Sequence, residues 1–403
     1  MINNPSHDAR FTPPLEGQGG GFHFLSAFRR ELQRMTSRRI YLGAAVVLPL
    51  FLLLFMTTIF GTGQMVKLPV GIVDADNTAT SRSIVRKIAA VPTLDVVAHY
   101  TDDNEARAAV KRKEVYGYLS IPPRFEEAVV RGTDATLNYY YHYALLAVGG
   151  EVMSAFETAL IPVRMAPIVD EAVMLGSTEQ NIETFLLPMT SDDHALYNPS
   201  LDYAVYLAVP IFFIMFLILV LLVTLYAVGS ERKSSSSSPL SLSFSFWLGK
   251  LLPYTLIFIA EALLAGVVFF HLEHIPFAGN MWLFALITVL FVVATQSVAV
   301  ILYALFPVLS LVISVVSMVG SLGATLSGLT FPLSAMSPVV QWVAKLFPVR
   351  HFTEAMQCVV YFDGGFSTCW PQLAVLCLFP LVMLLLLPRL QRIFLTHPYD
   401  TLE

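Results

Sequence analysis

The feature that most constrains this chain is a long stretch without charge. Residues 274–344 contain no Asp, Glu, Lys or Arg. A membrane-spanning helix needs about 20 predominantly apolar residues, so this stretch is long enough for two or three spans. Further uncharged runs cover 40–66, 203–230 and 364–388, and residues 251–272 are interrupted only by Glu261. The sequence therefore predicts an α-helical polytopic membrane protein.

Hydropathy and helix breakers divide these runs into six predicted transmembrane helices. Pro307 separates the fourth span from the fifth, because proline cannot continue a helix without losing a hydrogen bond. We expect residues 332–369, which lie between the last two spans, to form an external re-entrant or interfacial segment. The six predicted spans cover residues 40–62, 203–228, 251–271, 281–305, 308–331 and 370–388.

Most of the charge lies in one inserted segment. Residues 64–203 hold 11 of the 24 Lys and Arg and 19 of the 29 Asp and Glu, although the whole chain has only 13% charged residues. Short apolar runs alternate there with charged helical patterns, which favours a small α/β domain. We predict an α/β external (periplasmic) domain over 64–202, inserted between the first two spans.

The distribution of basic residues predicts the orientation. Arg29, Arg30 and Arg34 precede the first span, Lys250 precedes the third, and Arg389 follows the last. The positive-inside rule then places both termini in the cytoplasm, including a cytoplasmic tail over 389–403. Residues 1–21 are Gly- and Pro-rich and read as a disordered tail. Residues 22–39 are basic and amphipathic, so they form either a separate cytoplasmic interfacial helix or the start of the first span.

No enzyme motif occurs in the sequence. A phosphate-binding loop needs a Gly, four further residues and then Gly-Lys-Ser/Thr, but Gly249-Lys250 has Phe244 at the position of the first Gly and Leu251 after it. No basic domain suggests nucleic-acid binding. Among the three cysteines only Cys358 and Cys369 could pair, and two free thiols are the alternative. No metal site is predicted.

Several motifs together resemble the type-2 ABC exporter (ABC-2) permease family, in the branch with a large external domain between the first two spans. The resemblance extends over roughly residues 24–390 and is carried by motifs spread along the chain. The matching stretches are Gly71–Asp76, Ile121–Phe125, Tyr197–Pro199, Leu326–Met336 and Phe347–Phe352.

This resemblance implies the membrane subunit of an exporter in the bacterial inner membrane. The chain would bind no cofactor, because ATP and Mg would bind a separate ATP-binding cassette ATPase. A second permease subunit, either identical or a close paralogue, would complete the translocation path. Membrane lipid would surround both subunits. A periplasmic adaptor and an outer-membrane duct are further implied partners. We expect export of a small lipophilic molecule or drug. The alternative is an envelope scaffold or sensor whose external domain binds a ligand or a protein.

The resemblance also suggests roles for individual residues. Glu231, Arg232, Gly249 and Lys250 bracket the family's cytoplasmic coupling loop, here 229–250, and would couple the permease to the ATPase. The sequence departs from the family pattern after Arg232, where a serine run over 234–238 replaces the usual acidic residue and Gly-Thr turn.

Polar residues inside or beside the spans are candidates for the translocation path. An ionisable residue inside a span is a functional candidate by default, and a hydrogen-bonded packing role for Glu261 is the alternative. Small residues four apart let helices approach closely, within one subunit or at a dimer seam. The path candidates are Glu261, Gln296, Arg350 and His351, and the helix-packing candidates are Gly320, Ala324 and Gly328.

Overall fold

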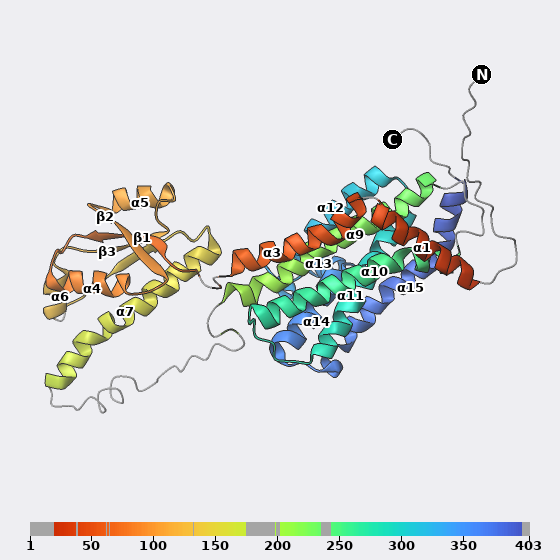
Figure 1. Ribbon diagram of the computed structural model, residues 1–403. Helices are drawn as coiled ribbons and strands as arrows, with labels where there is room; N and C mark the ends of the chain where they lie inside the picture. Colours follow the sequence, from red (N-terminus) through yellow and green to blue (C-terminus); the bar gives the residue numbers. More distant parts are fainter. Residues whose placement is uncertain are drawn as a thin grey trace, which may run out of the picture. The chain divides into compact units, whose positions relative to one another are not determined.

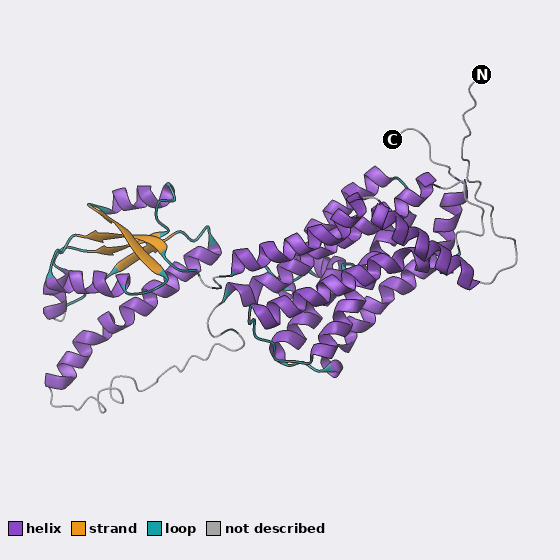
Figure 2. Cartoon of the chain, in the orientation of Figure 1, coloured by secondary structure: helices purple, strands orange, loops and turns teal. Residues whose placement is uncertain are grey.

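The chain folds into two compact units. The computed structural model describes residues 20–37, 39–61, 63, 65–131, 133–174, 198, 202–234 and 243–396. The membrane unit comprises Met1–Gly61 and Ala204–Glu403, and the inserted unit comprises Thr62–Tyr203. Figures 1 and 2 show a helical membrane unit and an inserted unit that combines strands with helices. The predicted tail over 1–21 lies almost entirely outside the described residues.

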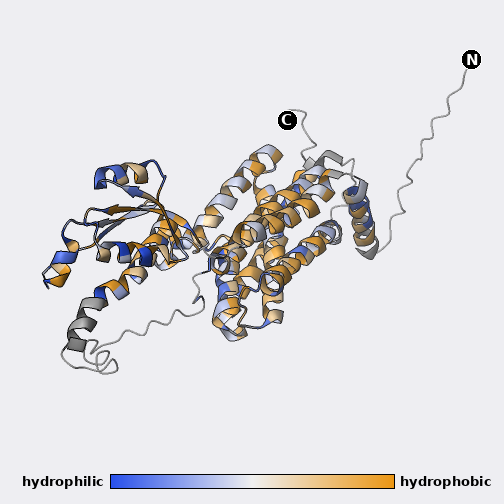
Figure 3. Cartoon of the chain, turned by 60° about the vertical axis from the view of Figure 1, so that its left-hand side comes forward, coloured by the Kyte–Doolittle hydropathy of each residue, from blue (hydrophilic) through white to orange (hydrophobic). Residues whose placement is uncertain are grey.

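Long helices form the membrane unit, and apolar residues dominate most of them (Figure 3). In three places an α-helix is directly continuous with a π-helical segment, so that the two form one longer apolar helix. The elements are α1 (Gly20–Ser37), α2 (Arg39–Leu42), η1 (Gly43–Val47), α3 (Leu48–Phe60), η2 (Ala204–Ala208), α9 (Val209–Ser234), α10 (Phe244–Val267), η4 (Val268–Leu272), α11 (Met281–Leu305), α12 (Leu309–Leu326), η5 (Leu333–Ala335), α13 (Pro338–Ala344), α14 (Pro348–Phe362) and α15 (Phe366–Thr396).

Seven described helical runs are long and apolar enough to cross a membrane. Six of them coincide with the predicted spans, and the seventh is Leu146–Met165 within α7 (Leu146–Met174) of the inserted unit. One face of α7 is buried by the sheet of that unit, where Val152, Phe156 and Leu160 are at most 1% exposed. The polytopic helical class is therefore supported, and the count of six spans stays a prediction.

The core of the membrane unit forms around α11. This helix contacts α9, α10, α14 and α15. Phe213 of α9 and Phe291 of α11 pack against Phe352 of α14, with ring centroids 4.5 Å and 4.2 Å from it. Such aromatic contacts bury large apolar areas and fix the relative positions of three helices. The segment 332–369 supplies α14, so part of it belongs to the packed core.

Several helix boundaries differ from the predicted ones. Helix α9 continues to Ser234 and α10 already begins at Phe244, so the predicted loop 229–250 is helical at both described ends. Ser243 explains the early start of α10, because its side chain accepts a hydrogen bond from the Phe246 N–H and caps the helix. Helix α15 likewise extends beyond the predicted 370–388 on both sides.

The inserted unit contains a four-stranded sheet in the order β2-β1-β3-β4. Strand β1 is parallel to β2 and β3, and β4 is antiparallel to β3. A capping box between Thr78 and Ser81 starts α4. The elements, besides α7, are β1 (Leu68–Asp74), α4 (Ala79–Ala89), β2 (Leu94–Tyr100), α5 (Asp103–Lys111), β3 (Gly117–Ile121), α6 (Phe125–Val130) and β4 (Asn138–Tyr141). The strand–helix alternation in the sequence thus corresponds to an α/β unit.

Candidate functional site

Helix α1 packs along α10, and its buried face is not the one that carries its leucines. Ala27, Glu31 and Met35 are buried, whereas Leu25 and Leu32 are about half exposed. The positions 27, 31 and 35 recur every four residues and form one stripe on the helix. A glutamate on this stripe can be buried only if charged or polar groups of the neighbouring helices surround it.

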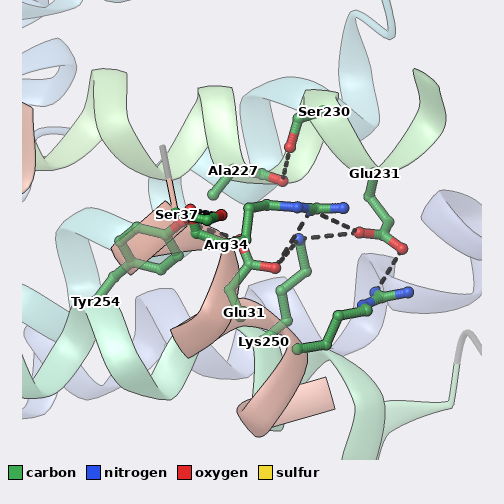
Figure 4. Close-up of polar contacts among 9 residues, drawn as sticks. Glu31, Arg34, Ser37, Ala227, Ser230, Glu231, Lys250 and Tyr254 are labelled. Atoms are coloured by element: carbon green, nitrogen blue, oxygen red, sulfur yellow. Dashed lines mark hydrogen bonds and ion pairs between the residues drawn. The ribbon is translucent and has the colours of Figure 1, made fainter. Parts of the chain in front are cut away.

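Those groups come from α9 and α10 and form a buried ion network with α1 (Figure 4). The Lys250 Nζ of α10 donates to Glu31 Oε2 at 2.8 Å and to Glu231 Oε2 at 3.0 Å. Arg30 donates to Glu231 Oε1 at 2.6 Å. The Arg34 guanidinium reaches both carboxylates, at 3.3 Å from Glu31 and 3.2 Å from Glu231. Three helices therefore share one set of ionic hydrogen bonds.

Burial makes this network sensitive to the loss of any member. The side chains of Lys250 and Glu31 are fully buried, and Glu231 is 2% exposed. Two carboxylates face three cations, so the set carries a formal charge of +1. Removing one partner of a buried ion pair typically costs about 3–5 kcal/mol, because a charge is left buried and uncompensated. The network therefore keeps α1 in register with α9 and α10.

One further hydrogen bond strengthens the junction of α1 and α10, and the ion pairs also affect the pKa of Arg34. The Tyr254 hydroxyl donates to Glu31 Oε1 at 2.9 Å, so both oxygens of this carboxylate are used. Burial alone would lower the pKa of Arg34, but the carboxylates of Glu31 and Glu231 outweigh it and raise that pKa above its usual value. Arg34 thus remains a fixed positive charge between two helices.

Gly249 allows the close approach of α1. A Cβ atom at this position would lie 2.4 Å from the backbone oxygen of Phe24, which is far too close for a side chain. Nearby, the Arg30 guanidinium lies 5.2 Å from the centre of the Phe246 ring, a cation–π distance. Gly249 therefore acts in the structure as a packing residue between α1 and α10.

The ion network contains two of the four residues expected at the coupling loop. Glu231 and Lys250 belong to it, Gly249 lies beside it, and the side chain of Arg232 is outside the described residues. Sequence reasoning missed Glu31 and Tyr254 as partners and treated the α1 arginines only as a basic surface. A glutamate within an otherwise basic helix was the available signal, because it breaks the charge pattern at one helical position.

Glu261 lies in the interior of the membrane unit at 7% exposure. Neither carboxyl oxygen has a hydrogen-bond partner among the described residues. Tyr254 and Gln296 were candidate partners by sequence, but neither bonds to Glu261. The Tyr254 hydroxyl donates to Glu31, and Gln296 accepts from the Thr255 hydroxyl at 2.6 Å through Oε1, while its Nε2 has no partner among the described residues. The hydrogen-bonded packing role with these two partners is therefore absent, and a path role stays a prediction.

Arg350 and His351 both lie on α14. The His351 Nε2–H donates to the Lys345 carbonyl oxygen at 3.0 Å, which ties α14 to the end of α13. Arg350 forms an ion pair with Glu354, one turn along the helix, at 3.5 Å. These contacts serve local structure, and a role of Arg350 and His351 in the translocation path stays a prediction.

The three small residues suggested for helix packing have different surroundings. A Cβ atom on Gly320 would lie 2.6 Å from the Ile218 side chain, so this glycine packs α12 against α9 within the subunit. Ala324 is half-buried on the same helix. Gly328 lies beyond the end of α12 with φ +85°, so it serves a turn and not a helix interface. The stripe of small residues on α12 therefore ends at Ala324, one member earlier than the sequence suggested.

All three cysteines, Cys358, Cys369 and Cys377, are free thiols in the structure. Of the two alternatives left open by the sequence, the structure holds the unpaired form. Gly364 lies directly against Cys358, since a Cβ atom there would be within van der Waals overlap of the sulfur. This thiol is therefore packed inside a tight turn at the end of α14.

The comparison with protein families identifies the class. The family model of the ABC-2 family transporter protein matches residues 39–387, and the chain belongs to this family. A curated relative is the probable multidrug ABC transporter permease YbhR of Escherichia coli strain K12, which is 21% identical over 357 residues. The match spans 87% of this chain and 94% of that protein, and the O157:H7 protein of the same name matches equally.

The family and the helices together define a multi-pass integral membrane protein and an ABC transporter permease. In this family the membrane subunit works with an ATP-binding cassette partner and is not itself the ATPase. The type-2 ABC resemblance inferred from the sequence motifs is thereby confirmed. The word multidrug belongs to the name of that relative.

Proposed function

We propose that this chain is the permease subunit of an exporter that moves a small lipophilic molecule or drug out of the cytoplasm or the inner leaflet. A separate ATPase, carrying ATP and Mg, supplies the energy. The multidrug name of the relative and the apolar character of the helices support this substrate class. The observation that carries the proposal is the buried ion network that joins α1, α9 and α10.

The network lies where a coupling device would be needed. Glu231 is three residues from the end of α9, and Lys250 is six residues after the start of α10. These two helix ends flank the segment expected to face the cytoplasm, and α1 follows the N-terminal tail on the same side. We expect the ATPase to dock on α1 and the segment between α9 and α10.

An ion network is suited to passing on a rigid-body movement. Its charges are buried and share partners, so α1 cannot slide along α10 without breaking several ionic hydrogen bonds at once. Helix junctions of this kind have a few discrete arrangements and do not deform continuously. A displacement of α1 by the ATPase would therefore move the ends of α9 and α10 with it.

The exposed face of α12 supports the presence of a second permease subunit. Hydroxyl residues recur along this face and are exposed, and four of the hydroxyls, from Ser314 onward, donate to backbone carbonyls of their own helix. A row of hydroxyls suits a close helix contact or a polar path better than lipid chains. The row consists of Ser310, Ser314, Ser317, Ser321 and Thr325.

The inserted unit would face the periplasm in this arrangement, with both termini in the cytoplasm of a bacterial cell. It could there meet an adaptor protein and an outer-membrane duct, as the branch of the family suggests. The proposal places no catalytic residue on this chain. Its residues position helices and transmit movement, while hydrolysis takes place on the partner.

Co-purification from native membranes tests the proposal. The full chain, tagged at the C-terminus, is extracted in mild detergent and its bound proteins are identified by mass spectrometry. An ATP-binding cassette protein should be present in a ratio of about one per permease chain. A preparation that contains only envelope proteins would instead favour the scaffold or sensor alternative.

A further inference from the structure

The inserted unit contains a cavity that the proposed transport function does not use. It has a volume of about 530 Å³ and lies between α6, α7 and residues 133–137, the segment that leads into β4. This cavity is called here the insert pocket. Small-molecule sites in proteins typically measure about 300–1,000 Å³, so the insert pocket has room for one small molecule.

The base of the insert pocket is apolar and belongs to the core of the inserted unit. Phe125 of α6 and Leu160 of α7 line it and are 4% and 1% exposed. Val129, Leu137 and Val163 also line it and are partly buried against the same core. A preformed apolar base of this kind favours a ligand with an apolar group, because binding removes that group from water.

The rest of the lining is exposed and mostly polar, so the insert pocket opens to solvent. It consists of Thr133, Asp134, Ala135, Thr136 and Arg164. The Thr133 hydroxyl is used by the fold, because it donates to the Ala128 carbonyl oxygen at 3.2 Å at the end of α6. The side chains of Asp134, Thr136 and Arg164 are accessible and can contact a ligand directly.

The insert pocket is lined by one anion and one cation that do not pair with each other. Neither Asp134 nor Arg164 forms an ion pair or a hydrogen bond with any other residue that the structure describes. Glu157, an acid earlier on α7, already accepts from the Tyr139 hydroxyl at 3.0 Å. A purely anionic ligand would be repelled by Asp134 and a purely cationic one by Arg164, whereas a ligand that carries both charges can satisfy both side chains.

We propose that the insert pocket binds a small amphoteric molecule with an apolar body. Its carboxylate would bind the Arg164 guanidinium, which can donate two parallel hydrogen bonds, and its ammonium group would bind Asp134. Its apolar body would cover Phe125 and Leu160. A short peptide of apolar residues has this chemistry, because its two ends carry opposite charges near neutral pH. The assignment goes beyond the proposed transport function and is independent of the exported molecule and of the ATPase.

Isothermal titration calorimetry of the full chain in nanodiscs tests the proposal, with the dipeptide leucylphenylalanine as the probe. The N-acetyl form of this dipeptide lacks the cation, and its C-terminal amide lacks the anion, while both keep the apolar body. A partly exposed ion pair corresponds to roughly a fivefold change in affinity. We therefore expect the free dipeptide to bind and each blocked form to bind about fivefold more weakly.

Charge variants show which side chain binds which end of the dipeptide. Arg164→Gln should bind the dipeptide about fivefold more weakly and should no longer distinguish it from its amide. Asp134→Asn should no longer distinguish the dipeptide from its N-acetyl form. The matched controls are Arg86→Gln on α4 and Asp95→Asn on β2, which remove exposed charges of the same unit outside the pocket. Both controls should keep the preferences of the wild type.

Filling the pocket should abolish binding. Ala135→Trp adds an indole ring to the exposed part of the lining, and the control Ala89→Trp adds the same ring at the end of α4, outside the pocket. We expect no binding in Ala135→Trp and unchanged affinity in Ala89→Trp. Each variant is first checked for a single symmetric peak in size-exclusion chromatography, and the comparison of blocked peptides on the wild type needs no substitution.

Other results overturn the assignment. Absence of binding to the wild type would show that the insert pocket does not take an amphoteric apolar molecule. If either blocked form binds as tightly as the free dipeptide, one of the two charges is not recognised and the amphoteric class is wrong. Equal binding in Ala135→Trp and Ala89→Trp would place the dipeptide outside the pocket. None of these results changes the outcome of the co-purification that tests the transport function.

Discussion

The substitution Lys250→Met probes the ion network most directly. It keeps the length of the buried side chain and removes its charge, so any effect arises from the lost ionic hydrogen bonds more than from a cavity. Lys250 holds Glu31 at 2.8 Å and Glu231 at 3.0 Å in the structure. After the substitution, both carboxylates keep Arg34, and Glu231 also keeps Arg30.

The contacts that remain set the expected magnitude. Removing one partner of a buried ion pair costs about 3–5 kcal/mol when the other charge is left alone. Because Arg34 still contacts both carboxylates, we expect a loss at the low end, about 3 kcal/mol in the free energy of unfolding. The exposed lysine Lys111 of α5 is the matched control, and Lys111→Met should change stability by less than about 0.5 kcal/mol.

A double-mutant cycle with Glu31→Gln measures the interaction energy between Lys250 and Glu31 separately from their contacts with other residues. Unfolding is followed for the wild type, Lys250→Met, Glu31→Gln and the double variant in mixed micelles with increasing SDS. Groups in one buried network usually show a coupling energy of about 0.5–3 kcal/mol. The reasoning is refuted if the two single effects add, or if Lys250→Met is as stable as Lys111→Met.

Three further predictions follow from other parts of the chain. Since neither Glu261 carboxyl oxygen has a hydrogen-bond partner among the described residues, Glu261→Leu should be at least as stable as the wild type in the same unfolding assay. Glu261→Gln should lower export only if the carboxyl takes part in transport. Burial would raise the pKa of Asp76, but hydrogen bonds from Thr78 and from the N–H groups of α6 lower it. Its contribution to stability is therefore present above about pH 4 and is lost as the pH falls through the folded-state pKa. The stability difference between the wild type and Asp76→Asn, measured by pulse proteolysis of the inserted unit, should shrink between pH 6 and pH 3, and a constant difference would contradict this. Cysteines placed at Ser236 and Asp134, in a chain without native cysteines, should be labelled from opposite sides of the membrane; labelling of both from outside would refute the predicted topology.

The sequence was most informative where hydropathy alone decides the structure. The uncharged runs correspond to long helices, and the predicted span 281–305 coincides with α11 (Met281–Leu305). Helix ends near charged residues were less predictable. A charge usually marks the end of a span, but Glu231 and Lys250 are buried within helices because charges from other segments compensate them. Such long-range pairing has no local signal in the sequence.

The candidate site shows the same limit. Glu31 and Lys250 are 219 positions apart, and periodicity assigns each to a helix without bringing them together. The large apolar residues of α1 do not mark its buried face either, because Leu25 and Leu32 are about half exposed while Glu31 is buried. Because Glu231 lies in the interior, a charge reversal at this position would damage the fold and would not report on coupling alone.

The most direct test of the coupling role uses Arg30, which is half exposed and less important for folding than Lys250. The measurement is the permease-dependent ATPase activity of the co-purified complex in proteoliposomes, for Arg30→Gln against Arg29→Gln, an exposed arginine on the same helix. A partly exposed ion pair contributes about 1 kcal/mol, which corresponds to roughly a fivefold change. We predict that Arg30→Gln lowers the stimulation about fivefold at an unchanged amount of bound ATPase, while Arg29→Gln leaves it unchanged. Equal stimulation in the two variants would contradict a coupling role for the network.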